Sequence, residues 1–151
     1  AFFDCTNGAK FSLYGSAGEK YPALEFLPGI DNQWFTGFPT PGNMDTTQAA
    51  VLELKMAAPT VNPILATQWT LSYRSVAAGQ NLFAGGVPFS LAPQLIAPAA
   101  LDTQVIFAYP IPANTLVAGS MVRQWLYRQG SVDSYAGSIQ LVDATLKYIP
   151  R

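Results

Sequence analysis

Apolar and polar side chains alternate with a period of two along several short stretches of the chain, the pattern of a β-strand with one buried face. The clearest stretches are residues 51–56 and 69–74. Residues 104–109 and 122–128 follow the same period, although both faces of 104–109 are apolar. Weaker patterns predict four further strands, at residues 10–14, 23–27, 33–38 and 81–89.

The last patterned stretch, residues 138–149, changes phase midway. Ile139 and Leu141 share one face of the predicted strand, whereas Ala144 and Leu146 share the other. An extra residue in one strand shifts the alternation by one position. The sequence therefore predicts a β-bulge near residues 142–143.

No segment has a convincing helical period; residues 45–56 begin with helix-compatible side chains but continue as a period-two strand. Twelve glycines and twelve prolines separate the predicted strands. We therefore predict an all-β fold: an antiparallel β-sandwich, jelly-roll-like, with eight or nine short strands and long Pro- and Gly-rich loops. The 151 residues are expected to form one domain, with residues 1–20 as an N-terminal hairpin turning at Asn7-Gly8 or as a loose arm.

Charged side chains are few and unevenly placed. They make up 11% of the chain, which has a net charge of −1, and between Met56 and Val122 only Arg74 and Asp102 are charged. A surface so poor in charge is expected to lie against protein. Seven prolines interrupt this stretch, which favours a soluble subunit of an assembly over a membrane protein. The lack of any basic cluster argues against binding to nucleic acid.

Residues 85–102 contain three prolines and are not expected to form a strand. The segment is apolar and carries no charge before Asp102. Two placements stay open, because it could fold over its own sandwich or lie on a neighbouring subunit. In the second case its apolar side chains form an oligomer or capsid interface: Val87, Phe89, Leu91, Leu95, Ile96 and Leu101.

The residue content argues against catalysis and against a bound cofactor or metal. Without histidine, the chain cannot build a Ser-His-Asp or Cys-His site, and zinc would lack its usual ligands. Cys5 is the single cysteine and stands beside Asp4, whose charge disfavours a reactive thiolate, so we expect it to be structural or incidental. One cysteine cannot form an internal disulfide, which fits assembly in a reducing cytosol. Calcium at residues 31–32 or 43–45 would match no defined motif.

Two other sets of side chains are candidate sites. Asp133 and Asp143 flank the final predicted turn, but turn capping and edge solubility account for them more simply than glycoside hydrolysis. Several aromatic side chains could stack on a sugar, although aromatics at strand spacing more often belong to a core or interface. These are Tyr21, Trp34, Trp125, Tyr127 and Tyr135.

The first ten residues contain no basic region followed by an apolar one, so we expect no signal peptide. A chain that starts at Ala1 fits either removal of methionine or cleavage of a precursor.

The C-terminal third combines an Arg-bearing strand, an acidic turn of the form Asp-x-Tyr-Ala-Gly and a final strand ending in Leu-x-Tyr. In this combination of features it resembles the ending of many small bacteriophage virion proteins of jelly-roll type. Residues 69–87 are similar to the same family's Trp-bearing strand and small-residue turn. Asp143-Ala144 departs from the family's frequent Gly-Val, at the predicted bulge. The matching positions are Arg128, Asp133, Tyr135, Ala136, Gly137, Leu141, Leu146 and Tyr148.

The resemblance implies a structural protein of the virion, usually a trimer. We expect a capsid decoration (cement) protein on the outer head surface, assembled in the host cytoplasm, with itself and the major capsid protein as partners. One alternative is a head-fibre or tail component that binds a receptor. Another is a carbohydrate-binding β-sandwich module. An enzyme is not expected.

Overall fold

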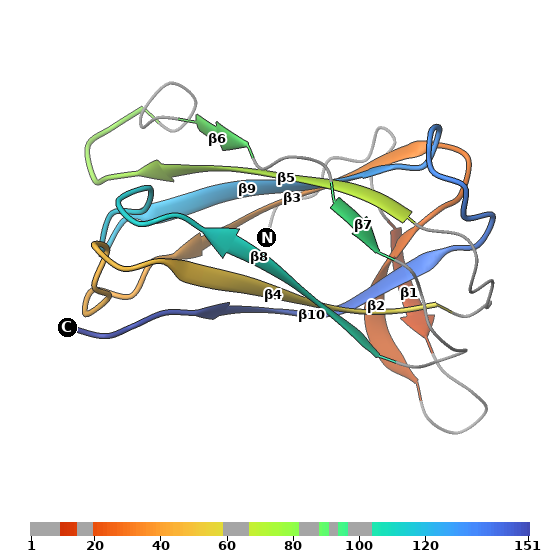
Figure 1. The fold of residues 1–151 in the computed structure, drawn as a ribbon, viewed down its shortest axis with the longest axis horizontal. Coiled ribbons are helices and arrows are strands. Elements are labelled where there is room, and N and C mark those ends of the chain that lie inside the picture. Colours follow the sequence, from red (N-terminus) through yellow and green to blue (C-terminus); the bar gives the residue numbers. More distant parts are fainter. Residues whose placement is uncertain (1–9, 15–19, 59–66, 82–87, 91–93, 97–103) are drawn as a thin grey trace.

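The computed structural model describes residues 10–14, 20–58, 67–81, 88–90, 94–96 and 104–151 (Figure 1). Within these ranges the chain forms ten strands and no helix, and so no helix that could cross a membrane. The strands are β1 (Lys10–Tyr14), β2 (Tyr21–Phe26), β3 (Asp31–Pro39), β4 (Ala50–Ala57), β5 (Thr67–Val76), β6 (Pro88–Ser90), β7 (Gln94–Ile96), β8 (Val105–Ile111), β9 (Met121–Gln129) and β10 (Ile139–Lys147).

The strands form two five-stranded antiparallel sheets that pack face to face (Figure 1). One sheet has the order β1-β2-β10-β4-β8. The other has the order β3-β9-β5-β6, with β7 pairing beside β6 along the same edge of β5. The pairs β2 with β10, β3 with β9, β4 with β8 and β5 with β6 are nested, as in a long hairpin rolled into two sheets. This order is that of a jelly roll and confirms the predicted fold class, with ten strands in place of eight or nine.

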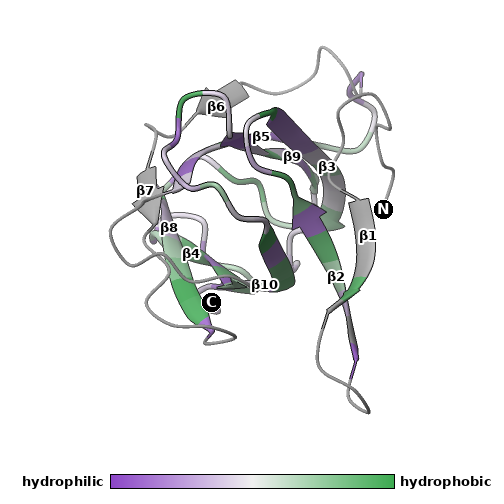
Figure 2. Ribbon diagram, turned by 90° about the vertical axis from the view of Figure 1, so that its right-hand side faces the viewer, coloured by the Kyte–Doolittle hydropathy of each residue, from purple (hydrophilic) through white to green (hydrophobic). Residues whose placement is uncertain are grey.

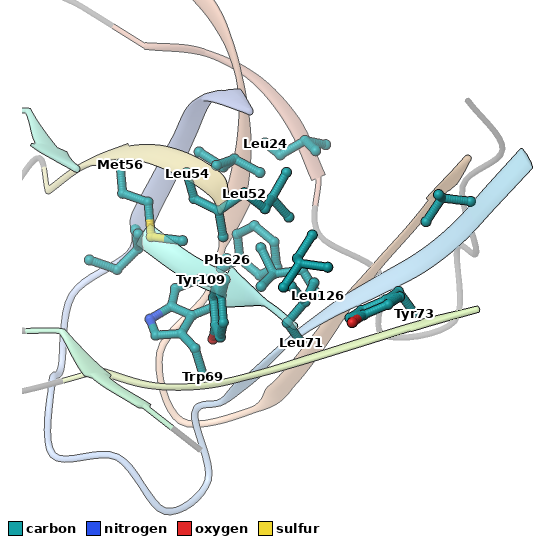
Figure 3. Packing of buried hydrophobic residues seen from close by; sticks show 14 of the residues in the cluster. Leu24, Phe26, Leu52, Leu54, Met56, Trp69, Leu71, Tyr73, Tyr109 and Leu126 are labelled. Atoms are coloured by element: carbon teal, nitrogen blue, oxygen red, sulfur yellow. The ribbon is translucent and has the colours of Figure 1, made fainter. Parts of the chain in front are cut away.

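The predicted alternation is borne out in the central strands. In β4 every second residue from Ala50 to Met56 is buried, and in β5 Trp69, Leu71 and Tyr73 point inward. These side chains meet between the sheets (Figure 3). The Phe26 and Trp69 rings pack edge to face with centroids 4.8 Å apart.

The predicted bulge in the last strand is confirmed. In the pairing of β10 with β4, Leu141 lies opposite Met56 and Asp143 lies opposite Lys55, so Val142 is the extra residue. Ile139 and Leu141 before the bulge are buried. The bulge lets the residues on either side of it contribute apolar side chains to the same core.

The prediction that residues 85–102 form no strand is wrong at two places. β6 and β7 each span three residues and pair with β5. Pro88 is the first residue of β6, a position where a strand tolerates proline. The weak alternation predicted at residues 81–89 reaches only the first two residues of β6, and no alternation indicates β7. Pairing with β5 holds both strands.

The proposed interface residues of this segment stay a prediction. Val87, Leu91 and Leu101 lie outside the described residues. For Phe89, Leu95 and Ile96 the structure gives the backbone pairing with β5 and no side-chain placement. The turn at residues 7–8 and Cys5 also lie outside the described residues.

Candidate functional site

Arg128, near the end of β9, is fully buried and satisfies all five of its N–H groups. Nε and Nη2 donate to the two carboxylate oxygens of Asp133 at 2.8 and 3.2 Å. Nη1 donates to the carbonyl oxygens of Phe26 and Gly137 at 2.9 and 3.0 Å, and Nη2 also donates to that of Tyr135 at 2.9 Å. One guanidinium thus joins β2 and β9 to the turn before β10.

The Asp133 and Gly137 part of this turn is closely packed. The Asp133 carboxylate also accepts from the backbone N–H groups of Gln68 and Tyr135. A Cβ at Gly137 would lie only 2.6 to 2.8 Å from the Tyr135 ring and hydroxyl. Arg128, Asp133, Tyr135 and Gly137 are among the positions that carry the resemblance to virion proteins, and their contacts hold the turn against the sandwich.

The acidic residues considered as a pair are not brought together. Asp133 is enclosed in the turn, whereas Asp143 lies on the outer face of the first sheet and accepts from Lys55 Nζ at 2.6 Å. Hydrogen bonding to Lys55 lowers the pKa of Asp143, and the same bond raises the pKa of Lys55. Two carboxylates in such different surroundings cannot act on one substrate.

The outer side chains of β10 and β4 form what we call the charged ladder. Its two ion pairs join Lys55 to Asp143 and Lys147 to Glu53, the second at 2.7 Å. All four side chains face solvent to some degree. The ladder gives this part of the first sheet a charged, solvated outer face.

The next strand of the same sheet, β8, carries no charge. In register with β4, Ile106 lies opposite Lys55 and Ala108 opposite Glu53, while Pro110 extends the row. All three are exposed, and Ile106 is 55% exposed. Within the described residues β8 pairs with β4 alone, so its other edge has no strand beside it. We call these three outward residues the uncharged edge.

The uncharged edge lies on one particular side of the sandwich. Figure 2 shows β7 and β8 along one side and β1, β2 and β3 along the opposite side. The strands from β5 to β8 contain a single charged residue, Arg74. Within the described residues, the uncharged strands β7 and β8 therefore lie on the same side of the molecule.

The outer face of the second sheet carries aromatic side chains, which we call the aromatic face: Phe35, Trp125 and Tyr127. Phe35 lies opposite Trp125 across the β3–β9 pairing, with ring centroids 6.4 Å apart. Tyr127 Oη donates to Asp31 at 2.6 Å, a bond that lowers the pKa of Asp31 and raises that of Tyr127. All three aromatic side chains are half-buried.

The other aromatic candidates lie elsewhere. Tyr135 is in the core beside Arg128, and the side chain of Tyr21 is outside the described set. Trp34, on β3, lines two adjoining hollows between β3 and β10, of about 260 and 310 Å³. We call these the β3–β10 groove. The first hollow is lined by Trp34, Thr36, Phe38, Gln124, Ala144 and Leu146, among others.

The chain offers no metal site in its described part. No group of three Asp, Glu or Cys side chains there is arranged to hold an ion. Asp31 accepts hydrogen bonds from Tyr127 and Ser131, and Asp45 accepts from Thr47. The loops considered for calcium use their carboxylates in these local bonds.

The burial of two polar side chains on β9 was not predicted from the sequence, although the signal was present. Gln124 and Arg128 fall in phase with Val122 and Leu126 on β9, and all four are buried. A polar residue in phase with a core face is an indication of a buried polar role. The alternation of residues 122–128 was therefore informative about more than the strand itself.

No family model matches the chain, and no curated protein does. Among solved structures, the enzymatically active domain of tailspike protein 4 from bacteriophage CBA120 is similar over 95% of this chain, with 11% identity and a TM-score of 0.48. The chain spans only 18% of that domain's length. TmCBM61, solved with β-1,4-galactotriose, matches over 85% of this chain and 71% of its own, with 9% identity and a TM-score of 0.41. A CBM4 structure matches over 93% and 78%, with 13% identity and a TM-score of 0.43.

Similarity at this level carries no argument about function. The β-sandwich assignment rests on the strand order given above.

Proposed function

We propose that this chain is a non-enzymatic structural subunit that associates through the uncharged edge, as a decoration protein on a bacteriophage head. The observation that carries the proposal is the abrupt end of charge across one sheet. Lys55 and Glu53 on β4 have ion-pair partners on β10, while their neighbours on β8 are Ile106 and Ala108.

An edge strand without charge is prone to pair with another chain. Proteins whose edge strands face water usually protect them with Lys, Pro or a bulge. In β8, Pro110 is the only such feature, and Ile106, further along the same strand, is exposed. A partner strand on this edge would remove apolar surface from water. It would also form hydrogen bonds with the backbone groups of β8 that face away from β4. A stable interface needs about 800 Å² from each partner.

The virion setting comes from the resemblance in the C-terminal third. Its residues form the buried turn around Arg128, so the resemblance concerns how the domain closes and leaves the attachment surface free to vary. On the outer head surface, many copies of a shallow apolar contact would add up to firm attachment. The expected partners are other copies, as a homotrimer, and the major capsid protein.

The proposal predicts an assembly that one buried charge disrupts. Ile106→Asp places an unpaired carboxylate in the interface and should dissociate it. Val132→Asp is the matched control, because Val132 is 64% exposed in a turn after β9, outside the charge-poor stretch. Light scattering should give a multiple of 16.2 kDa for the wild type and the control, and a monomer for Ile106→Asp. A monomeric wild type would overturn self-association.

Attachment to the capsid is tested separately, by sedimentation with undecorated phage heads at low and at molar salt. Apolar contact holds as salt rises, whereas ion pairs are screened. Saturable binding that survives molar salt is expected. Binding that salt abolishes would assign attachment to the charged ladder, and absence of binding would exclude decoration.

A second candidate is recognition of a receptor glycan, as in a tail component or a carbohydrate-binding module. The observation that favours it is the aromatic face, where Phe35 and Trp125 lie in register and Tyr127 is held by Asp31. Trp125→Ala should then abolish retention on immobilised glycans and leave the oligomer intact. Retention that does not change in this variant would exclude the aromatic face.

A further inference from the structure

An indole N–H and an amide side chain both line the β3–β10 groove. The indole Nε1 of Trp34, in the wall of the groove, is buried and meets no acceptor within the described part of the chain. Gln124 lines the first hollow and is only 3% exposed. The groove thus brings an unpartnered N–H and an amide to the same place.

Unpartnered buried groups such as this N–H are uncommon because they are costly. Most buried polar groups in proteins have a hydrogen-bond partner, and an unpaired one destabilises the fold. Val122 and Leu126, on the same face of β9, are apolar and buried. Gln124 stands between them on that face, and its amide lines the same groove as the unpartnered Trp34 N–H. A molecule that enters the groove would meet both polar groups.

The lining of the groove limits the chemistry of that molecule. Among the described residues, no charged side chain lines the first hollow, and only Asp143, which is paired with Lys55, lines the second. A charged ligand would lose its hydration without gaining a counter-charge. The ligand must instead be neutral, with an apolar face for Trp34 and Phe38 and groups that both donate to and accept from an amide. Hydroxyl groups do both.

We propose that the β3–β10 groove binds a single uncharged sugar residue, with the Trp34 ring as its wall and the Gln124 amide as its hydrogen-bond partner. The Thr36 hydroxyl lines the same hollow and is a second polar contact. A hollow of about 260 Å³ lies at the small end of ligand sites, which suits one ring and not a polymer lying along a sheet. The site is separate from the uncharged edge and from the aromatic face, and it shares the ligand class of the second candidate function while using a different surface.

The three tryptophans allow a direct test, because each reports on a different place. Trp34 is in the groove, Trp125 is on the aromatic face, and Trp69 is in the core, where its Nε1 donates to Thr67 at 2.8 Å. Protein labelled with 5-fluorotryptophan should give three ¹⁹F signals. Titration with the methyl glycosides of glucose, galactose and N-acetylglucosamine should shift the Trp34 signal with at least one sugar and leave Trp69 unchanged.

Variants distinguish sugar binding in the groove from sugar binding on the aromatic face. Gln124→Leu should weaken sugar binding at least tenfold, because it removes the amide that lines the hollow. Thr36→Val is a second, milder variant in case the first disturbs packing. Trp125→Phe is the matched control and should leave the titration of Trp34 unchanged.

Three results would overturn the proposal. The first is no shift of Trp34 with any of the glycosides, which would mean that water alone fills the groove. The second is a shift confined to Trp125, which would place sugar on the aromatic face. The third is a shift of Trp34 with hexanol and none with the sugars, which would make the groove an apolar site.

Discussion

Two ion-paired regions of this molecule use the same chemistry in opposite surroundings. In the turn before β10, Arg128 and Asp133 are both completely buried. On the charged ladder, Lys55 and Asp143 are 32% and 47% exposed. A buried pair whose every donor is satisfied fixes one arrangement of the chain, because either partner alone would be an uncompensated charge. An exposed pair is screened by water and contributes little.

The comparison separates two uses of charge in a chain that has little of it. Inside, charge defines how the domain closes, since Arg128 binds the carbonyl groups of Phe26 and Gly137 as well as Asp133. Outside, charge keeps a sheet face in water. The uncharged edge has no charged side chain that could fix the fold or keep the sheet solvated. We therefore regard it as a surface for another protein.

The largest effect is expected from Asp133→Ala. It leaves the guanidinium of Arg128 buried without its counter-charge, and should cost about 3–5 kcal/mol of the free energy of unfolding. Urea denaturation measures the loss, with Asp143→Ala as the control from the ladder. Equal losses in the two variants would contradict the contrast between buried and exposed pairs.

A smaller effect is expected from Gly137→Ala, in the same buried turn. The added Cβ would lie 2.6 to 2.8 Å from the Tyr135 side chain, which is itself buried. Moving that ring should cost about 1–3 kcal/mol. Gly42→Ala is the matched control, because its Cβ would meet nothing within 4 Å. If both variants melt alike, the turn is looser than its geometry indicates.

The smallest effect is expected on the ladder, from Lys55→Ala. The Lys55 bond lowers the pKa of Asp143 below its usual 3.8, so this carboxylate stabilises the fold above that pH and loses its contribution as the pH falls through the lowered value. Lys55→Ala should return the pKa of Asp143 toward 3.8 and leave the melting temperature almost unchanged at pH 7. NMR titration of the Asp143 carboxyl carbon measures the first effect and calorimetry the second.

Salt sharpens the same measurement. Exposed pairs are screened at high ionic strength. The difference in the pKa of Asp143 between wild type and Lys55→Ala should shrink in molar sodium chloride. A difference that persists there would mean that the pair is more buried than its exposure indicates.

The sequence was sufficient for the strands whose burial alternates. β4 and β5 match the predicted strands, and the phase change in β10 placed the bulge at Val142. Local pattern was sufficient because each of these strands packs one face on a common core. The short strands β6 and β7 could not be predicted in this way, because pairing with β5 overrides the proline-rich pattern.

The sites were harder to predict for a related reason. The positions of Arg128 and Asp133 were noticed from the resemblance, but their burial together depends on the turn that brings residue 133 back to β9. The groove depends on β3 and β10, which are distant in sequence and belong to different sheets. Spacing along one strand carries no information about such a meeting.

The position of β10 in the first sheet bears on how the domain folds. The last strand in the sequence lies between β2 and β4, so Leu24 pairs with Leu141 and Leu54 with Ala144 across most of the chain length. Pairings this distant must close long loops before they gain contacts, which makes folding slow. During synthesis, β2 and β4 cannot be joined in one sheet until residues 139–147 emerge, although β8 can already pair with β4. The same strand that completes the sheet therefore ends the period in which the chain is most exposed to aggregation.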